Sequence, residues 1–223
     1  KKVGNINPYL LEGSHAYISR KSSPISSLPV MVYGELLNDG GNLILTAQER
    51  NNLLNEDKFF KSITKKLIGA KEFIRGEERW CFFIEQSQIE KVSKYEFVLN
   101  RLKMVTQHRL NSTGKSTQNI AMEPHRYYFS AFRPGNSIII PTVSSINRLY
   151  IPIGFLDSSN LIIAPNQAIY DAKPWIFSVI SSKMHMVWVK TISGKMKTDY
   201  RYSSNLCYNT FPFPNISHKR KEE

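Results

Sequence analysis

Three neighbouring apolar runs place the strongest limit on how this chain folds. Residues 138–140 (III) and 161–163 (LII) flank residues 143–156, whose sequence is VSSINRLYIPIGFL. Short β-branched runs bounded by Pro, Ser and Asn are typical of strands. The hydrogen-bonding side chains between them belong to Ser144, Ser145, Asn147 and Arg148. We expect these side chains at the rim of a sheet, where a rigid scaffold presents a recognition loop. A solvated hairpin loop is the alternative.

Length and charge point to a folded domain with a polyanionic partner. The chain has 223 residues, 41% of them hydrophobic, which is enough for one large domain or two small lobes. Lys and Arg number 30 against 18 Asp and Glu, a formal charge of +12. The excess positive charges repel one another in a compact chain, and this repulsion is usually tolerated where a polyanion is the partner. Nucleic acid is the first candidate and an anionic membrane surface the second.

The sequence shows no sign of a membrane span or a disulfide framework. No apolar stretch approaches the roughly 20 residues that a spanning helix needs, and no signal-peptide pattern opens the chain. Cys81 and Cys207 are far apart and isolated, which suggests reduced thiols. We therefore expect a basic cytoplasmic domain without a membrane partner.

Hydrophobic spacing and turn residues give a coarse order of elements. Strands are expected at residues 16–18, 31–33, 126–132 and 137–141, and a hairpin at 72–85. Helices are expected at residues 46–55, 58–67, 88–110 and 173–192. A Thr46–Glu49 capping box opens the first helix. Polar loops are expected at residues 19–29, 38–41 and 111–119. This order predicts an α+β fold of small twisted β-sheets with packed helices and recognition loops at the sheet edges.

The chain divides by composition into three parts. Residues 1–13 are interpreted as an entry linker, residues 14–214 as the folded domain and residues 215–223 as a charged tail. The polar segment near residues 111–125 is the place where the domain could split into two lobes.

Motifs for catalysis or metal binding are incomplete. Residues 114–117 (GKST) suggest a phosphate loop, but Arg109 stands where that motif needs Gly, and the segment follows a predicted helix. Residues 7–9 (NPY) lack the second Pro of the amino-methyltransferase signature. The His and Cys residues never fall at metal-ligand spacing, and no Gly-x-Ser-x-Gly elbow is present. The chain offers no convincing active site, and Lys115 is better interpreted as a phosphate contact in a flexible loop.

Basic residues interleaved with aromatics and amides favour nucleic-acid binding. They are Arg126, Arg133, Asn147, Arg148, Lys183, His185 and Arg201. Lys and Arg neutralise phosphates irrespective of sequence, whereas Asn and Arg pair bidentately with adenine and guanine edges. Each residue alone is better interpreted as a surface charge, and only the set together with the formal charge of +12 makes nucleic-acid binding the leading hypothesis. An RNA-binding module whose aromatics stack unpaired bases, or a basic lobe that docks an acidic protein, are the alternatives.

Eight motifs in order along the chain carry a more specific signal. They are residues 5–10 (NINPYL), 24–26 (PIS), 38–43 (NDGGNL), 69–74 (GAKEFI), 143–145 (VSS), 150–154 (YIPIG), 182–186 (SKMHM) and 199–203 (DYRYS). Together they resemble the target-recognition region of MmeI-like enzymes. These are single-chain type II restriction–modification proteins that combine an endonuclease, an adenine-N6 methyltransferase and a DNA-reading domain.

The resemblance implies that this chain reads duplex DNA for a methyltransferase domain of the same parent protein. It implies no cofactor in this region, with S-adenosylmethionine and Mg expected only in other domains. The parent is expected to be a site-specific adenine-N6 methyltransferase with endonuclease activity. Many relatives carry an acidic residue near the position of Ile146, and this departure affects which base pair the loop reads.

Two sets of DNA-contacting residues follow. The base-reading set is Ser145, Ile146, Asn147, Arg148, Lys115 and Ser116. The backbone-contacting set is Arg20, Lys21, Arg126, Arg133, Ser144, Lys183, His185 and Arg201. Arg148 is favoured over Asn147 as the base reader, because Arg–guanine is the commonest specific contact. The alternative is that Arg148 pairs with Asp157 and only holds the loop in shape.

Overall fold

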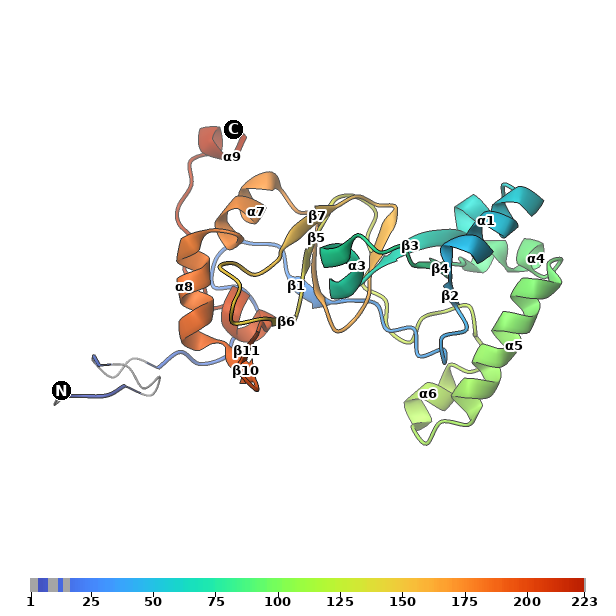
Figure 1. The fold of residues 1–223 in the computed structure, drawn as a ribbon, viewed down its shortest axis with the longest axis horizontal. Coiled ribbons are helices and arrows are strands. Elements are labelled where there is room, and N and C mark those ends of the chain that lie inside the picture. The colour runs from blue at the N-terminus through green and yellow to red at the C-terminus, as the bar shows by residue number, and fades with distance from the viewer. Residues whose placement is uncertain (1–3, 8–11, 14–16, 223) are drawn as a thin grey trace. The chain divides into compact units, whose positions relative to one another are not determined.

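The computed structural model describes residues 4–7, 12–13 and 17–222, which form two compact units (Figure 1). Unit 1 comprises the described residues up to 32 together with 133–156 and 165–222, and unit 2 comprises residues 33–132 and 157–164. The division therefore falls after Phe132 rather than within residues 111–125, and the chain returns to unit 2 once. Much of the expected linker and Ala16 of the expected first strand lie outside the described residues, and Tyr17 and Ile18 are not in a strand.

Unit 2 is built on a four-stranded sheet in the order β2-β4-β3-β8. Its strands are β2 (Ile44–Leu45), β3 (Thr64–Ile68), β4 (Trp80–Phe82) and β8 (Asn160–Ile162). β8 pairs parallel to β3, whereas the other pairs are antiparallel. The apolar run at residues 161–163 thus completes the sheet of unit 2.

Helices pack around this sheet. They are α1 (Ala47–Glu56), α2 (Phe60–Ile63), α3 (Ala70–Arg75), the 3-10 helix η1 (Gln86–Gln88), α4 (Ile89–Val92), α5 (Glu96–Leu110) and α6 (Lys115–Asn119). The predicted capping box is confirmed: Thr46 Oγ1 accepts from Glu49 N at 3.1 Å and Glu49 Oε2 accepts from Thr46 N at 2.8 Å.

Several predicted elements of unit 2 are wrong, because distant pairing overrides local spacing. The helix over 58–67 ends at Ile63, since residues 64–68 form β3 between two other strands. The hairpin over 72–85 begins instead with α3, which Glu72 caps by accepting from Gly69 N at 2.9 Å. The polar loop 111–119 contains α6.

Two further predictions for unit 2 also fail. The helix expected over 88–110 is interrupted where Tyr95 becomes extended, since its ring packs 4.7 Å from that of Phe60. Residues 126–132 form no strand, and only Phe129 makes an isolated bridge, to Leu36.

Unit 1 contains two small sheets. The first has the order β1-β9-β5-β7, from β1 (Met31–Tyr33), β9 (Gln167–Tyr170), β5 (Ser137–Ile140) and β7 (Gly154–Leu156). The second has the order β10-β11-β6, from β10 (Gly194–Met196), β11 (Asp199–Arg201) and β6 (Val143–Ser144). Ile138, Ile140 and Ile169 from the first sheet pack with Tyr200 from the second in one hydrophobic core. The fold class is therefore α+β, as predicted.

The helices of unit 1 are α7 (Pro174–Ile180), α8 (Lys183–Ile192), the π-helix η2 (Ser204–Tyr208) and α9 (His218–Glu222). The single helix predicted over 173–192 is two helices. Ser182 is extended and caps α8, because its Oγ accepts from His185 N at 3.2 Å. Within the described residues, no helix has the length and apolar character needed to cross a bilayer.

Candidate nucleic-acid interface

Residues 145–150, here called the recognition loop, leave the end of β6 in a tight turn. Ser145 O accepts from Arg148 N at 3.1 Å, and Ser145 Oγ accepts from Asn147 N at 3.3 Å. A third bond joins the loop to the neighbouring strand, where Asp199 Oδ1 accepts from Ile146 N at 3.1 Å. Three main-chain N–H groups are thus bonded, so the turn has a defined shape.

The recognition loop exposes large apolar side chains beside polar ones. Ile146, Leu149 and Tyr150 are 45%, 78% and 47% exposed. Asn147 is exposed and Arg148 half-buried. Exposed apolar groups gathered on one surface are typical of interaction sites. The loop therefore offers both hydrogen-bond donors and apolar groups to a partner.

Arg148 makes no ion pair among the described residues. The Asp157 carboxylate, its expected alternative partner, accepts from the Ser159 hydroxyl at 2.5 Å, from Ser159 N at 2.8 Å and from Asn160 Nδ2 at 2.9 Å. These bonds hold the pKa of Asp157 below its usual value. The guanidinium of Arg148 therefore keeps its donors available for a ligand.

The β10-β11-β6 sheet places two predicted phosphate contacts next to the recognition loop, but only one is accessible. Arg201 pairs with Val143 and is exposed. Ser144 pairs with Tyr200, and its hydroxyl is buried. The prediction that Ser144 contacts the DNA backbone is therefore wrong for this conformation.

Lys183 and His185 share α8 but differ in environment. Lys183 is exposed in the first turn. His185 is 0% exposed, and its Nε2 lies 2.9 Å from the Tyr202 hydroxyl. Burial lowers the pKa of His185 to about 4, so the imidazole is neutral at pH 7. The predicted phosphate contact of His185 is wrong, because its side chain is a neutral part of the core.

The segment that carries Arg20 and Lys21 is attached to the region of η2. Lys21 N donates to Asn205 O at 3.0 Å, and Asn209 Nδ2 donates to Lys21 O at 2.9 Å. Both basic side chains are exposed. Arg133 lies 3.8 Å from Asp171, and both side chains are exposed, so this pair adds little stability and leaves Arg133 accessible.

Lys115 and Ser116 belong to unit 2, in the first turn of α6. Both are exposed, and Ser116 Oγ accepts from the Tyr128 hydroxyl at 3.1 Å. Arg126 is ion-paired with Glu123 at 2.7 Å. The predicted base readers thus lie in two units, with Ser145–Arg148 in one and Lys115–Ser116 in the other.

Buried Arg109 shapes the segment that carries α6. Its guanidinium donates to five main-chain carbonyl oxygens, those of Leu37, Asn38, Ile120, Glu123 and Arg126, at 2.7–3.2 Å. Asn38 Nδ2 also donates to Thr117 Oγ1 at 2.8 Å. The residue that stands where a phosphate loop needs Gly is therefore a structural anchor.

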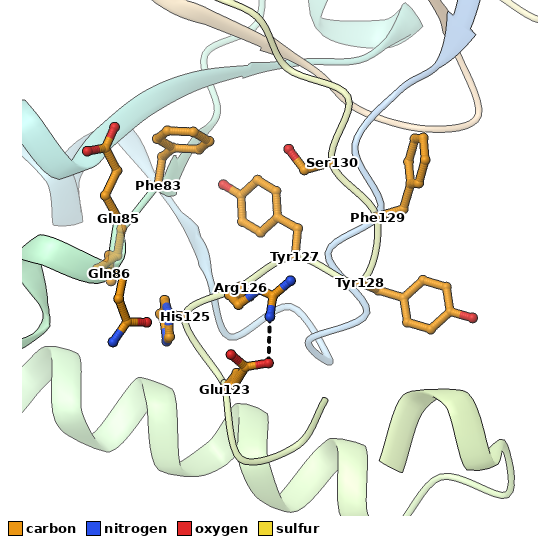
Figure 2. Close-up of a pocket in the computed structure, with 11 residues that line it drawn as sticks. Phe83, Glu85, Gln86, Glu123, His125, Arg126, Tyr127, Tyr128, Phe129 and Ser130 are labelled. Carbon is orange, nitrogen blue, oxygen red and sulfur yellow. Dashed lines mark hydrogen bonds and ion pairs between the residues drawn. The ribbon is translucent and has the colours of Figure 1, made fainter. Parts of the chain in front are cut away.

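A pocket of about 630 Å³ in unit 2 lies between residues 83–86 and 123–130 (Figure 2). Figure 2 shows aromatic rings along it, with the Arg126–Glu123 ion pair at one side. Glu85 and Glu123 place two carboxylates on the lining, which repel a phosphate. The described residues contain no group of three or more His, Cys, Asp or Glu side chains that could hold a metal. We therefore place the interface on the loops rather than in this pocket.

A family model described as "MmeI, target recognition domain" matches residues 12–215. The chain belongs to this family. It is 39% identical over 223 residues to DNA methyltransferase A of Bacillus subtilis (strain 168), covering 100% of this chain and 25% of that protein. The resemblance inferred from the eight motifs is therefore confirmed.

A solved structure of the type IIL restriction–modification enzyme MmeI in complex with DNA matches with a TM-score of 0.90. The two chains are 34% identical over 100% of this chain and 30% of that chain. The MmeI-type target recognition domain thus spans about a quarter to a third of the relatives it matches.

Sequence reasoning missed two features of this MmeI-type domain. Asp199 was noted only as the first residue of a family motif, although its carboxylate holds the recognition loop. The hairpin of β10 and β11 was not predicted, because Lys197 and Thr198 at its turn are not the usual Asn or Gly. The alternation of polar and apolar residues in Lys195, Met196 and Lys197 was the available signal for a strand before Asp199.

Proposed function

We propose that this chain binds a specific duplex DNA sequence as the target recognition domain of a restriction–modification adenine-N6 DNA methyltransferase. The observation that carries the proposal is the match over the whole chain to MmeI, a structure described as in complex with DNA. The formal charge of +12 supports it, because phosphate neutralisation supplies much of DNA affinity. Double-stranded DNA is the proposed partner.

In this proposal the recognition loop reads base edges. Arg148 presents a planar fork of donors that suits guanine O6 and N7, whereas Asn147 suits adenine N6 and N7. Arg–guanine is the commonest specific contact, and the Arg148 guanidinium makes no ion pair among the described residues. We therefore assign the reading role to Arg148. Lys115 and Ser116 supply a second reading position from unit 2.

Exposed basic side chains hold the duplex in register. The proposed backbone contacts are Arg20, Lys21, Arg126, Arg133, Lys183 and Arg201, all of them exposed. Phosphate contacts position a protein on DNA without reading its sequence. In this proposal the phosphate contacts determine the affinity for DNA, and the recognition loop determines the sequence preference.

The bound duplex is presented to a methyltransferase domain of the same parent protein. Enzymes that modify a base first extrude it from the stack, so a reading domain must place the target adenine at that domain. S-adenosylmethionine and Mg are proposed to bind in other parts of the parent. The relative DNA methyltransferase A, of which this chain matches 25%, supports a parent with further domains.

Competition binding tests the proposal. Randomised duplex DNA, hairpin RNA and a polyanionic protein are offered at equal charge over a series of salt concentrations. We expect one duplex sequence to be enriched and affinity to fall steeply with salt. Preferential capture of the RNA would favour the RNA-binding alternative. Preferential capture of the polyanionic protein without sequence enrichment would favour the docking lobe.

Calorimetry with S-adenosylmethionine tests the division of labour. We expect no saturable binding and no methyl transfer to DNA by this chain. Stoichiometric cofactor binding would overturn the assignment of the methyl donor to another domain.

A further inference from the structure

The β10–β11 hairpin is a basic projection tied to the recognition loop. Met196 pairs with Asp199, so a two-residue turn of Lys197 and Thr198 closes the hairpin. All three residues of β10 are exposed. Asp199 accepts a hydrogen bond from Ile146 N, and β11 pairs with β6. The hairpin and the recognition loop are therefore directly connected.

Lys197 holds the tip in an unfavourable backbone conformation. Its φ is 56°, and among the described residues the other non-glycine residues with positive φ are Asn38 and Asp171. Asn and Asp tolerate this region through short polar side chains, whereas Lys gains no such compensation. Two-residue hairpin turns ordinarily use Gly or Asn here. Strain of this kind gathers at functional sites, which directs attention to the Lys197 ammonium.

Positive charge is concentrated around the same hairpin. Lys195 Nζ lies 3.6 Å from the centre of the Tyr200 ring. Burial, and to a smaller extent the charge of Lys190, lower the pKa of Lys195. None of Lys190, Lys195 and Lys197 takes part in an ion pair among the described residues. Like charges held together disfavour the free state unless a polyanion neutralises them.

We propose that the β10–β11 hairpin is a phosphate-binding site for duplex DNA, in which Lys197 and Lys195 contact the phosphodiester backbone beside the base pairs that the recognition loop reads. The proposal rests on the proposed function and adds residues to it. Since Asp199 joins hairpin and loop, phosphate contacts at the tip also fix the register of the loop on the duplex.

The substitutions Lys197→Gly and Lys197→Asn separate strain from binding. Both residues adopt positive φ readily, so the melting temperature should stay constant or rise. Affinity should fall roughly threefold to tenfold for every duplex sequence alike, and the slope of log affinity against log salt should become shallower by about one unit. Lys197→Arg retains the charge and should keep both affinity and slope.

Lys173→Asn provides a matched control. Lys173 is exposed and precedes α7, and Figure 1 shows α7 and the hairpin at opposite ends of α8. This substitution should leave affinity and slope unchanged, since Asn also caps a helix well.

Two results would overturn the inference. One is unchanged affinity and slope in Lys197→Gly; the other is an equal loss in Lys197→Arg, which would show that charge is not the cause. In either case sequence-selective binding by the unsubstituted chain would leave the proposed function standing. Absence of duplex binding by the unsubstituted chain would overturn both.

Discussion

The main-chain N–H of Ile146 donates a hydrogen bond of 3.1 Å to Asp199 Oδ1. This bond joins the recognition loop to β11, a strand whose own register against β6 is set by pairing of Tyr200 with Ser144. The loop is therefore ordered before it meets a ligand, which lowers the entropy that binding must overcome.

Asp199→Ala should weaken binding to the preferred duplex about tenfold, which corresponds to about 1.4 kcal/mol, because a charge-assisted hydrogen bond that orders the loop is lost. Binding to other duplexes should change little. Asp199→Asn keeps an acceptor oxygen and should retain most of the preference. Selection from a randomised duplex library measures both, and equal loss on all sequences would contradict a positioning role.

Arg148→Ala should cost about 1–3 kcal/mol on the preferred site and relax the preference at one base pair. Its melting temperature should not change, since Arg148 makes no ion pair among the described residues. Asn147→Ala is the comparison and should have the smaller effect. A library profile beside a melting curve decides the matter: unchanged preference with a lower melting temperature would refute the reading role.

Replacing Arg20, Lys21 or Lys183 by Ala should weaken binding to all sequences alike. Each loss of a phosphate contact should reduce the salt slope by about one unit. Lys71→Ala is the control, because Lys71 is an exposed lysine outside the proposed backbone contacts. If Lys71→Ala reduced the salt slope equally, the change in slope would come from net charge rather than from a lost phosphate contact.

Sequence signals that lie within a few residues predicted their elements well. The Thr46–Glu49 capping box, Pro174 in the first turn of α7 and the turn at residues 38–41 all match the structure. Each of these depends on hydrogen bonds or dihedral preferences inside one turn. Residues 64–67 were wrongly predicted as helix, because they form a strand by pairing with β4 and with β8, which is distant in the chain.

In the candidate site, too, local features could be predicted from the sequence and features that depend on distant residues could not. Exposure of Asn147 and of Lys183 could be predicted from their polar surroundings. Burial of His185 could not, because its partner Tyr202 is 17 residues away and Phe211, whose ring centre lies 4.5 Å from the imidazole, is more distant still. A histidine beside a lysine has the same local pattern whether it faces solvent or the core.

Arg109→Met should lower the free energy of unfolding by about 3–5 kcal/mol, because five carbonyl oxygens, one buried and four partly buried, lose their donors. Hydrogen exchange should rise first in residues 111–126, which those bonds hold. Arg126→Ala removes an exposed ion pair and should cost less than about 1 kcal/mol. Equal stability of the two variants in chemical denaturation would contradict the anchoring role of Arg109.

His185 should make the fold sensitive to mild acid. The unfolded chain takes up a proton on this imidazole near its usual pKa of 6.5, whereas burial lowers the pKa in the folded chain to about 4. Between these values the unfolded state binds more protons, so stability falls as the pH falls. Once the imidazole is protonated in both states, the free energy of unfolding has fallen by about 3 kcal/mol.

His185→Gln places an amide near Tyr202 and removes this titration. The difference in free energy of unfolding between wild type and His185→Gln should therefore shrink as the pH is lowered from 6.5 to 4. His218→Gln, at an exposed position, should follow the wild-type curve. Parallel curves for wild type and His185→Gln, measured by denaturant unfolding across this pH range, would show that His185 does not titrate as its burial requires.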